Sequence, residues 1–241
     1  DDALFGGDGD DQFIGGTGKD TAVFSSKSNV INLSTTKKQN TKDGKDILIG
    51  IENVNGGGGN DKLYGSKGSN ILNGGTGNDL LVGGLGNDKL IGGKGKDSAV
   101  FSSKSNVINL STTKKQNTKD GKDILIGIES VNGGGGNDKL YGSKGSNILN
   151  GGTGNDLLVG GLGNDKLIGG KGKDIFKLST GKGYDLIQDF KDKQDKIFIG
   201  SMKKLKLKNK GKNVFIYDGN DLLAKVKGAK GLLLKKGKYL V

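Results

Sequence analysis

One apolar residue recurs at every ninth position along much of the chain, as at Leu63, Leu72, Leu81 and Leu90. Each is the middle one of three residues that favour a short β-strand, and polar, glycine-rich residues separate one strand from the next. Because side chains alternate across a strand, the middle residue can face inward while its neighbours face outward. The pattern therefore predicts many short strands that each contribute one side chain to a thin apolar core.

The six residues before each predicted strand have the form G-G-x-G-x-D, as in GGTGNDLLV and GGLGNDKLI between Gly74 and Ile91. The three glycines permit the positive φ values that a tight turn needs. A turn and a strand in every nine residues give a coil whose full turn is eighteen residues. Residues eighteen positions apart should then stack in neighbouring strands, roughly 4.8 Å from each other. The complete signature occurs ten times and two weaker copies, GSKGSN, keep its register; the complete copies begin at Gly6, Gly15, Gly56, Gly74, Gly83, Gly92, Gly133, Gly151, Gly160 and Gly169, and the weaker ones at Gly65 and Gly142.

This stacking would place aspartates above one another, for example Asp61 over Asp79 and Asp138 over Asp156. Two unit charges about 5 Å apart repel by roughly 3 kcal/mol at an effective dielectric constant near 20, so such a column requires a cation between the turns. Carboxylates and turn carbonyls are hard oxygen donors that suit Ca²⁺, whereas Mg²⁺ demands a stricter octahedral geometry. The chain has no His and no Cys, so zinc and copper lack their usual ligands.

The candidate calcium ligands are the aspartates that end the signatures or occupy the equivalent position: Asp2, Asp11, Asp20, Asp61, Asp79, Asp88, Asp97, Asp138, Asp156, Asp165 and Asp174. Asn70 and Asn147 stand at this position in the weaker copies and predict weaker sites. The alternative is that Asn-Asp and Gly-Gly pairs merely form hairpin turns. Hairpins would not require Asp at a fixed nine-residue interval with one inward apolar residue per repeat, so the sequence favours the metal.

The in-phase G-G-x-G-x-D signatures resemble the calcium-binding nonapeptide of the RTX (repeats-in-toxin, haemolysin-type) family. This resemblance implies an all-β fold, a parallel β-roll solenoid that binds several Ca²⁺ ions. A roll that buries one thin apolar layer also suits a chain with 48 Gly and a low content of aromatic and aliphatic residues.

The roll is expected over residues 1–176, within which two units of 77 residues, 21–97 and 98–174, match at 75 positions. Each unit contains a 32-residue insert in which the glycine signature lapses. In the first insert, Val30–Leu33 and Ile47–Ile51 predict two strands, and the polar stretch between them predicts a protruding loop with a turn at Asp43-Gly44. We expect the inserts to form wider turns that continue the solenoid.

Residues 177–241 are expected to form a small β cap over the open edge of the roll. Gly183-Tyr184-Asp185-Leu186-Ile187-Gln188-Asp189-Phe190, followed by Asp195-Lys196-Ile197-Phe198-Ile199, resembles the segment after the repeats in many RTX proteins, notably serralysin-type proteases. An ordinary pair of strands around a turn is the alternative. Further strands are predicted at Leu205–Lys208, Val214–Tyr217, Leu222–Val226 and Leu232–Leu234, and this stretch resembles the closing segment of RTX proteins, including many cyanobacterial ones. By this resemblance the segment also contains a type I export signal.

The net charge of +12 is concentrated near the C-terminus. Residues 177–241 carry 17 Lys against 6 acidic residues, whereas residues 1–176 carry 21 Lys against 20. A basic segment can attract anionic polysaccharide, lipid headgroups or nucleic acid. The alternative is a solvated surface in a lysine-rich proteome, which the absence of Arg favours. No apolar run of eighteen residues is present, so no membrane-spanning segment is predicted.

The resemblance implies a calcium-binding structural and secretion module of an extracellular or cell-surface protein, exported by type I machinery and folded by Ca²⁺ outside the cell. The composition supports this order, because so little apolar surface can hardly offset a chain entropy of about 1–2 kcal/mol per ordered residue. The sequence opens in mid-repeat at Asp1–Phe5, so we expect the C-terminal part of a longer protein.

Two other functions remain open. The chain could be the tail of a secreted protease or lipase whose catalytic domain lies upstream; no enzymatic activity is expected in these residues, which contain no His, no Cys and no G-x-S-x-G turn. It could also be an adhesion or surface-layer module that binds anionic polysaccharide. The residues upstream of Asp1 would test the first possibility, and salt-sensitive binding to such a polysaccharide would test the second.

Overall fold

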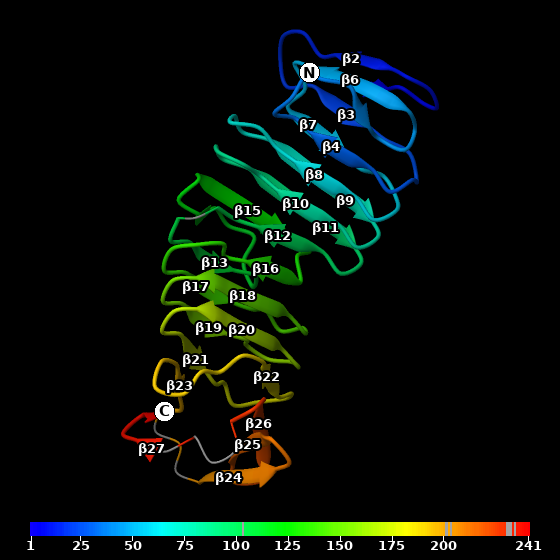
Figure 1. The fold of residues 1–241 in the computed structure, drawn as a ribbon. Helices are drawn as coiled ribbons and strands as arrows, with labels where there is room; N and C mark the ends of the chain where they lie inside the picture. Colours follow the sequence, from blue (N-terminus) through cyan, green and yellow to red (C-terminus); the bar gives the residue numbers. More distant parts are fainter. Residues whose placement is uncertain (103, 201, 203, 230–232, 234) are drawn as a thin grey trace. The chain divides into compact units, whose positions relative to one another are not determined.

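A computed structural model describes residues 1–241 except 103, 201, 203, 230–232 and 234. The described residues form β-strands joined by turns and no helix, so the predicted all-β class is confirmed (Figure 1). None of them forms a helix long and apolar enough to cross a membrane. The chain divides into two compact units: unit 1 contains Asp1–Ser102 and Thr112–Ser130, and unit 2 contains Ser103–Ser111 and Val131–Val241.

Unit 1 winds the chain alternately through sheets of short parallel strands. One sheet has the order β1 (Ala3–Phe5), β3 (Thr21–Val23), β7 (Asn53–Asn55), β9 (Ile71–Thr76), β11 (Lys89–Lys94) and β15 (Lys122–Ile126), with β14 (Gln116–Asn117) antiparallel at its edge. A second run of parallel strands has the order β4 (Val30–Asn32), β8 (Lys62–Tyr64), β10 (Leu80–Val82) and β12 (Ser98–Val100). A small third sheet contains β2 (Gln12–Ile14), β6 (Lys45–Ile49) and β5 (Gln39–Asn40).

Unit 2 has a similar alternation of its own and ends in antiparallel strands. One sheet has the order β13 (Val107–Asn109), β17 (Lys139–Tyr141), β19 (Leu157–Val159), β21 (Ile175–Lys177), β23 (Lys196–Phe198), β28 (Tyr239–Leu240) and β27 (Lys235–Lys236). The other run has the order β16 (Ser130–Asn132), β18 (Ile148–Thr153), β20 (Lys166–Lys171), β22 (Asp185–Ile187), β26 (Asp221–Val226), β25 (Asn213–Asp218) and β24 (Leu205–Lys210).

The strand register confirms the eighteen-residue turn of the coil. Leu80 pairs with Lys62 on one side and with Ser98 on the other, and all three strands run parallel. In unit 2, Leu157 pairs with Lys139 in the same way. The inward residues of most nonapeptide strands are completely buried, as predicted, although Leu4 of β1 is only half-buried. The completely buried residues form the core: Ala22, Ile31, Leu63, Leu72, Leu81, Leu90 and Ala99 in unit 1, and Ile108, Leu140, Leu149, Leu158, Leu167 and Phe176 in unit 2.

Each insert adds strands to the coil rather than a free loop. The two predicted strands of the first insert are present as β4 and β6. Thr21 pairs with Asn53, which lies 32 positions further along the chain. The polar stretch between these strands contains β5, which pairs antiparallel with β6. Leu48 of β6 is buried and takes the place of the inward residue of a nonapeptide, while Ile49 is exposed.

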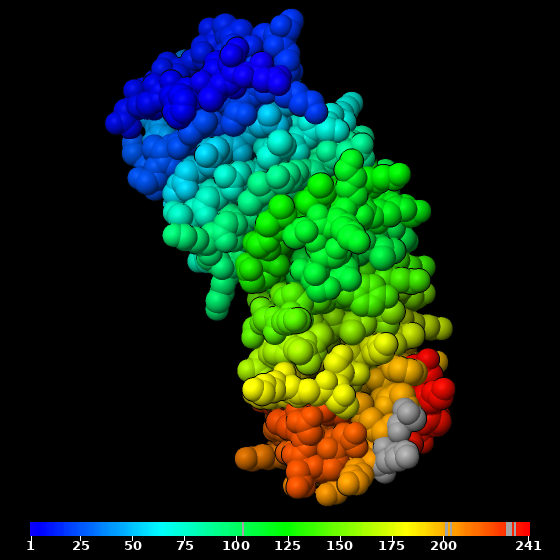
Figure 2. Space-filling model, turned by 180° about the vertical axis from the view of Figure 1, so that it is seen from behind, coloured from blue at the N-terminus to red at the C-terminus, as the bar shows by residue number. Residues whose placement is uncertain are grey.

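The C-terminal strands pair with the last turns of the roll in unit 2. β22 and β23 run parallel to β20 and β21 and so extend the coil. β26 then pairs with β22, and β28 pairs with β23, so the final strands lie against the last turns (Figure 2). Three of the strands predicted in this segment lie within β24, β25 and β26. Of the strand predicted at Leu232–Leu234, only Leu233 belongs to the described residues.

Candidate metal centre

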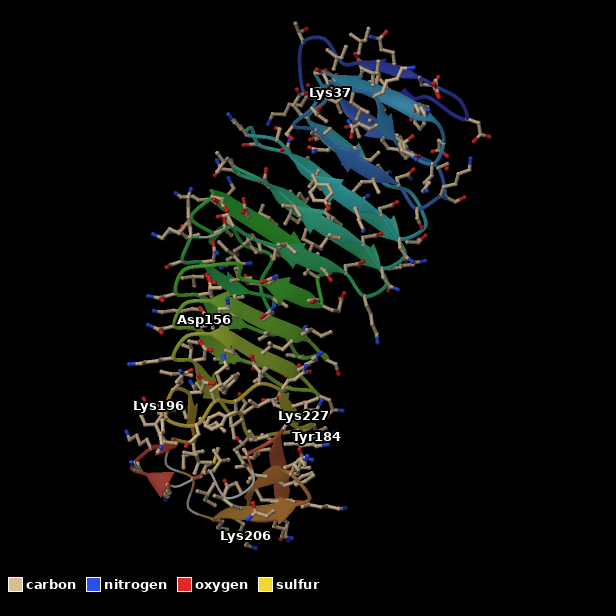
Figure 3. All side chains as sticks on the ribbon, in the orientation of Figure 1. Lys37, Asp156, Tyr184, Lys196, Lys206 and Lys227 are labelled. Carbon is tan, nitrogen blue, oxygen red and sulfur yellow. The ribbon has the colours of Figure 1, made fainter. Side chains whose placement is uncertain are left out.

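The signature aspartates lie in turns directly before strands, and those from Asp20 to Asp174 each contact the neighbouring turn through Oδ1. Oδ1 of Asp79 accepts a hydrogen bond from the backbone N–H of Asp61 at 2.7 Å, and Oδ1 of Asp97 accepts one from the N–H of Asp79 at 2.8 Å. Asp156, at the turn before β19 (Figure 3), accepts the N–H of Asp138 at 2.7 Å. The aspartates therefore stack in columns at eighteen-residue intervals.

The second oxygen of nearly every predicted ligand is buried and has no hydrogen-bond partner. This holds for Oδ2 of Asp11, Asp20, Asp61, Asp79, Asp88, Asp97, Asp138, Asp156, Asp165 and Asp174. Asp2, the remaining candidate, is exposed. A buried polar atom without a partner is rare in proteins because its desolvation is not compensated. The same oxygen is unpaired at each of these ten positions, an arrangement that suits a cation as its ligand.

The first glycine of the signature leaves room for this oxygen. A Cβ atom placed on Gly74 would lie 2.2 Å from Oδ2 of Asp79. The same clash would occur at Gly56 with Asp61, at 2.3 Å, and at Gly151 with Asp156, at 2.3 Å. Any side chain at the first position would therefore displace the carboxylate from its place in the turn.

The second and fourth positions bring backbone carbonyls between successive turns. Gly75 and Gly77 have φ values of 98° and 135°, which only glycine adopts easily. A Cβ atom on Gly75 would lie 2.2 Å from the carbonyl oxygen of Gly57, and one on Gly77 would lie 1.7 Å from that of Gly59. The space between two turns is therefore bordered by carbonyl and carboxylate oxygens, which is the donor set that Ca²⁺ prefers.

Burial raises the pKa of the stacked aspartates in both units. It raises the pKa to about 7 at Asp61 and Asp88, and to about 6 at Asp138, Asp156 and Asp174. The charge of the next aspartate in the column adds to this effect at Asp61 and Asp156. Without a cation the ionised columns are thus unfavourable near neutral pH, and a divalent cation would remove that cost.

Within the described part of the chain, no three carboxylates converge on one point. A Ca²⁺ ion between two turns would therefore have few carboxylate ligands, and backbone carbonyls would complete a shell of six to eight oxygens. The residues present fit calcium on these terms, because each turn supplies carbonyl oxygens at its glycines.

The two weaker signatures close their turns without an unpaired oxygen. Oδ1 of Asn70 accepts the N–H of Ser66 at 2.7 Å, and its amide nitrogen donates to the carbonyl of Glu52 at 2.7 Å. Oδ1 of Asn147 accepts the N–H of Ser143 at the same distance. At Asn70 the amide donates a hydrogen bond to a carbonyl where an aspartate would leave an unpaired anionic oxygen. Weaker calcium binding at these two turns stays a prediction.

The inserts contribute carboxylates that the repeat pattern did not identify. Asp123 of the second insert accepts the N–H of Asp88 at 2.8 Å, so Asp88 has a stacked neighbour beyond Asn70. The other carboxylate oxygen of Asp123 is not free, because it accepts a hydrogen bond from the hydroxyl of Thr118 at 2.5 Å. Asp46 and Thr41 have the same arrangement in the first insert. The signal was present in the sequence, since Asp46-Ile47-Leu48-Ile49 repeats the D-x-apolar-x order of the nonapeptide without its glycines.

Further acidic residues extend the columns at the inserts and beyond the last signature. Glu52 accepts the N–H of Asp20 at 2.9 Å, and Asp195 accepts that of Asp174 at 3.0 Å. Asp185 lies against Asp165, and burial together with the Asp165 charge raises the pKa of Asp185. The closing segment thus continues the carboxylate columns after the glycine signature has ended.

The chain was compared with curated proteins, with solved structures and with protein families. No curated protein matches the chain. Among solved structures, the extracellular lipase LipA from Serratia marcescens matches with 18% sequence identity and a TM-score of 0.26. That match covers 70% of this chain and 38% of the lipase chain.

The pattern of a repeat family, by contrast, covers more than half of the chain. The family described as "RTX calcium-binding nonapeptide repeat (4 copies)" matches residues 1–22, 46–81, 64–99, 123–158, 141–176 and 150–187. Two of these matches begin at Asp46 and Asp123, and the last one includes Asp185. The matched residues include all ten aspartates with an unpaired Oδ2. The chain belongs to the RTX calcium-binding repeat family, and its repeats bind several Ca²⁺ ions in a parallel β-roll.

Proposed function

We propose that this chain is a structural module of an extracellular protein and that it folds when Ca²⁺ binds. The eleven predicted aspartates would serve as carboxylate ligands, and the glycine carbonyls of adjacent turns would complete each shell. The observation that carries this proposal is the unpaired Oδ2 at ten of those aspartates. Each is a buried acceptor that lacks a positive partner in the protein.

The energetics support a coupling of folding to metal binding. The core receives one inward side chain per nonapeptide, such as Leu72 or Leu81, so hydrophobic burial per ordered residue is small. The stacked aspartates oppose the metal-free fold at neutral pH, because burial raises their pKa. Binding of Ca²⁺ to the folded state alone then supplies the missing free energy.

This coupling gives a physical reason for folding outside the cell. A chain that stays unfolded where calcium is scarce can pass an export channel as an extended polypeptide and fold where calcium is abundant. We propose that residues 177–241 close the roll and also carry a type I export signal. Secretion by Gram-negative cells with a type I exporter should be lost when residues 205–241 are removed, and unchanged secretion would refute this role.

The folding proposal is tested by far-UV circular dichroism of the complete chain. We expect coil spectra in chelator, β spectra in millimolar Ca²⁺, and little change in Mg²⁺ at the same concentration, because Mg²⁺ retains its waters and demands octahedral geometry. Coincident spectra in chelator and in Ca²⁺ would refute the proposal.

A further inference from the structure

The C-terminal antiparallel strands place lysines and aromatic rings on one face of their sheet. In the register of β24, β25 and β26, Lys208 pairs with Phe215, which pairs with Lys225, and Lys206 pairs with Tyr217. Directly opposed residues of antiparallel strands project to the same side of a sheet. We call this side the lysine face; it consists of Lys206, Lys208, Lys210, Phe215, Tyr217 and Lys225. The opposite side carries the buried residues Val214, Ile216, Ala224 and Val226.

The positive charges of the lysine face have no acidic partners. Lys206, Lys208 and Lys210 are exposed, and no lysine of these described strands lies within ion-pair distance of a carboxylate. Lys208 Nζ lies 5.0 Å from the centroid of the Tyr217 ring, and Lys225 Nζ lies 5.9 Å from that of Phe215. Contacts with aromatic faces hold the ammonium groups in place without neutralising their charge. Figure 3 shows Lys206 on β24, the outermost strand of this sheet.

The same arrangement occurs a second time in unit 2. Lys177 pairs with Phe198, Phe198 with Tyr239, and Tyr239 with Lys236, so a row across four strands has lysine at both ends. Lys177 Nζ lies 5.9 Å from the Phe198 ring, and Lys196 Nζ lies 5.7 Å from the Tyr239 ring. All four lysine–aromatic contacts found among the described residues lie in the C-terminal segment.

The spacing of these charges fits a linear polyanion. Alternate residues of a strand lie roughly 6.6 Å apart on one face, and neighbouring strands lie about 4.8 Å apart, so the lysine face presents a regular array of positive charge. Residues 177–241 hold 17 Lys and 6 acidic residues, so the surrounding field is also positive. A surface with this excess attracts polymers of negative charge and binds them less tightly as salt is added.

The aromatic rings of the lysine face favour an acidic polysaccharide over a single-stranded nucleic acid. Single-stranded nucleic acids need open aromatic faces on which bases stack. Here Lys208 and Lys225 already lie over Tyr217 and Phe215. We propose that the lysine face binds an acidic polysaccharide through the carboxylate or sulfate groups along its chain, a function beyond calcium-dependent folding.

The proposal is tested with the full chain in Ca²⁺ by calorimetric titration of hyaluronate and of heparin, with neutral dextran as the negative control and each polymer titrated into the same Ca²⁺ buffer as the blank. The test variant is Lys206→Gln/Lys208→Gln/Lys225→Gln. The matched control is Lys62→Gln/Lys89→Gln/Lys139→Gln, which removes the same charge from strands of the roll. Each exposed ion pair changes affinity by roughly two- to five-fold, so we expect the test variant to bind about ten-fold more weakly or worse. The control should bind like the native chain.

Circular dichroism in Ca²⁺ establishes that both variants are folded, so this test is separate from that of the folding proposal. Affinity that falls with added salt and is lost mainly in the test variant would support the lysine face as the site. An equal loss in both variants would overturn it, because net charge alone would then explain binding. No binding of either acidic polysaccharide would also overturn it. So would tighter binding to a single-stranded oligonucleotide or to phosphatidylserine vesicles than to both polysaccharides.

Discussion

Replacement of the central aspartate of each column by asparagine should affect the calcium-bound and calcium-free chains in opposite directions. We consider Asp79→Asn and its equivalent Asp156→Asn together, because either copy alone could mask a loss in the other. Asp79 is stacked between Asp61 and Asp97 and would serve two adjacent ions. Asparagine fits the turn, as Asn70 shows at the same position in a weaker signature.

The magnitude follows from the two sites that each residue would serve. A site at a free calcium concentration one hundred times its Kd stabilises the fold by about 2.7 kcal/mol. Loss of two such sites per substitution removes roughly 5 kcal/mol, and for a chain of this size each kcal/mol lowers Tm by about 2–4 °C. Without calcium the sign reverses, because burial raises the pKa of Asp79 and of Asp156 and a neutral side chain avoids that cost.

Thermal unfolding followed by circular dichroism, in Ca²⁺ and in chelator, measures both effects. The matched control is Asp46→Asn/Asp123→Asn, in which the second carboxylate oxygen already accepts a threonine hydroxyl. We expect a fall in Tm of roughly 20 °C or more in Ca²⁺ for the first pair, because its two substitutions together remove roughly 10 kcal/mol. We expect a much smaller fall for the control, and more β structure in chelator for the first pair. Equal falls in both pairs, or less β structure in chelator, would show that these aspartates do not hold calcium.

Three further outcomes are expected. Gly74→Ala should raise the calcium concentration at the folding midpoint, because its Cβ would lie 2.2 Å from Oδ2 of Asp79. The control Gly68→Ala should not, because its Cβ meets only a side-chain oxygen at 3.7 Å. Equal midpoints of the two variants in a calcium titration would contradict the role assigned to the first glycine. Asn147→Asp should add calcium affinity at its turn, and unchanged or lower affinity by calorimetry would count against the register. The metal-free chain should gain β structure as pH falls from about 7.5 to 5. The pKa of Asp61 is about 7 in the folded chain, above the value of an exposed Asp, so the folded chain binds the proton more tightly than the unfolded chain and is stabilised as pH falls. The calcium concentration at the folding midpoint should rise as pH falls over the same interval, because protons compete with Ca²⁺ for the carboxylates. A midpoint that does not depend on pH would mean that these carboxylates are not ligands.

The regular part of the fold could be predicted from sequence because every repeat carries the same two features, an inward apolar residue and a glycine-rich turn. One inward leucine and three glycines per nine residues are enough to set the coil, and the eighteen-residue register of Leu80 with Lys62 and Ser98 follows directly. The stacking of the aspartates follows from the same period. Each of these contacts joins residues that are only eighteen positions apart.

The inserts could be predicted less well because their carboxylates reach the columns without the glycine signature. Asp123 stacks on Asp88 at a separation of 35 residues, and Glu52 stacks on Asp20 at 32. The hairpin of β14 and β15 holds Asp123 in place, and antiparallel pairing across a polar stretch has no fixed period in sequence. Lys119 also adopts a positive φ of 61°, a conformation that the sequence alone does not suggest for lysine.

Hydrogen exchange measured by mass spectrometry, with and without Ca²⁺, tests the coupling of folding to calcium most directly. The backbone amides of Asp61, Asp79 and Asp156 donate to the carboxylate of the next turn, so their protection reports the columns themselves. We expect residues 56–100 and 133–176 to exchange rapidly in chelator and to become protected together when Ca²⁺ is added. Equal protection of these residues in chelator and in Ca²⁺ would contradict calcium-dependent folding.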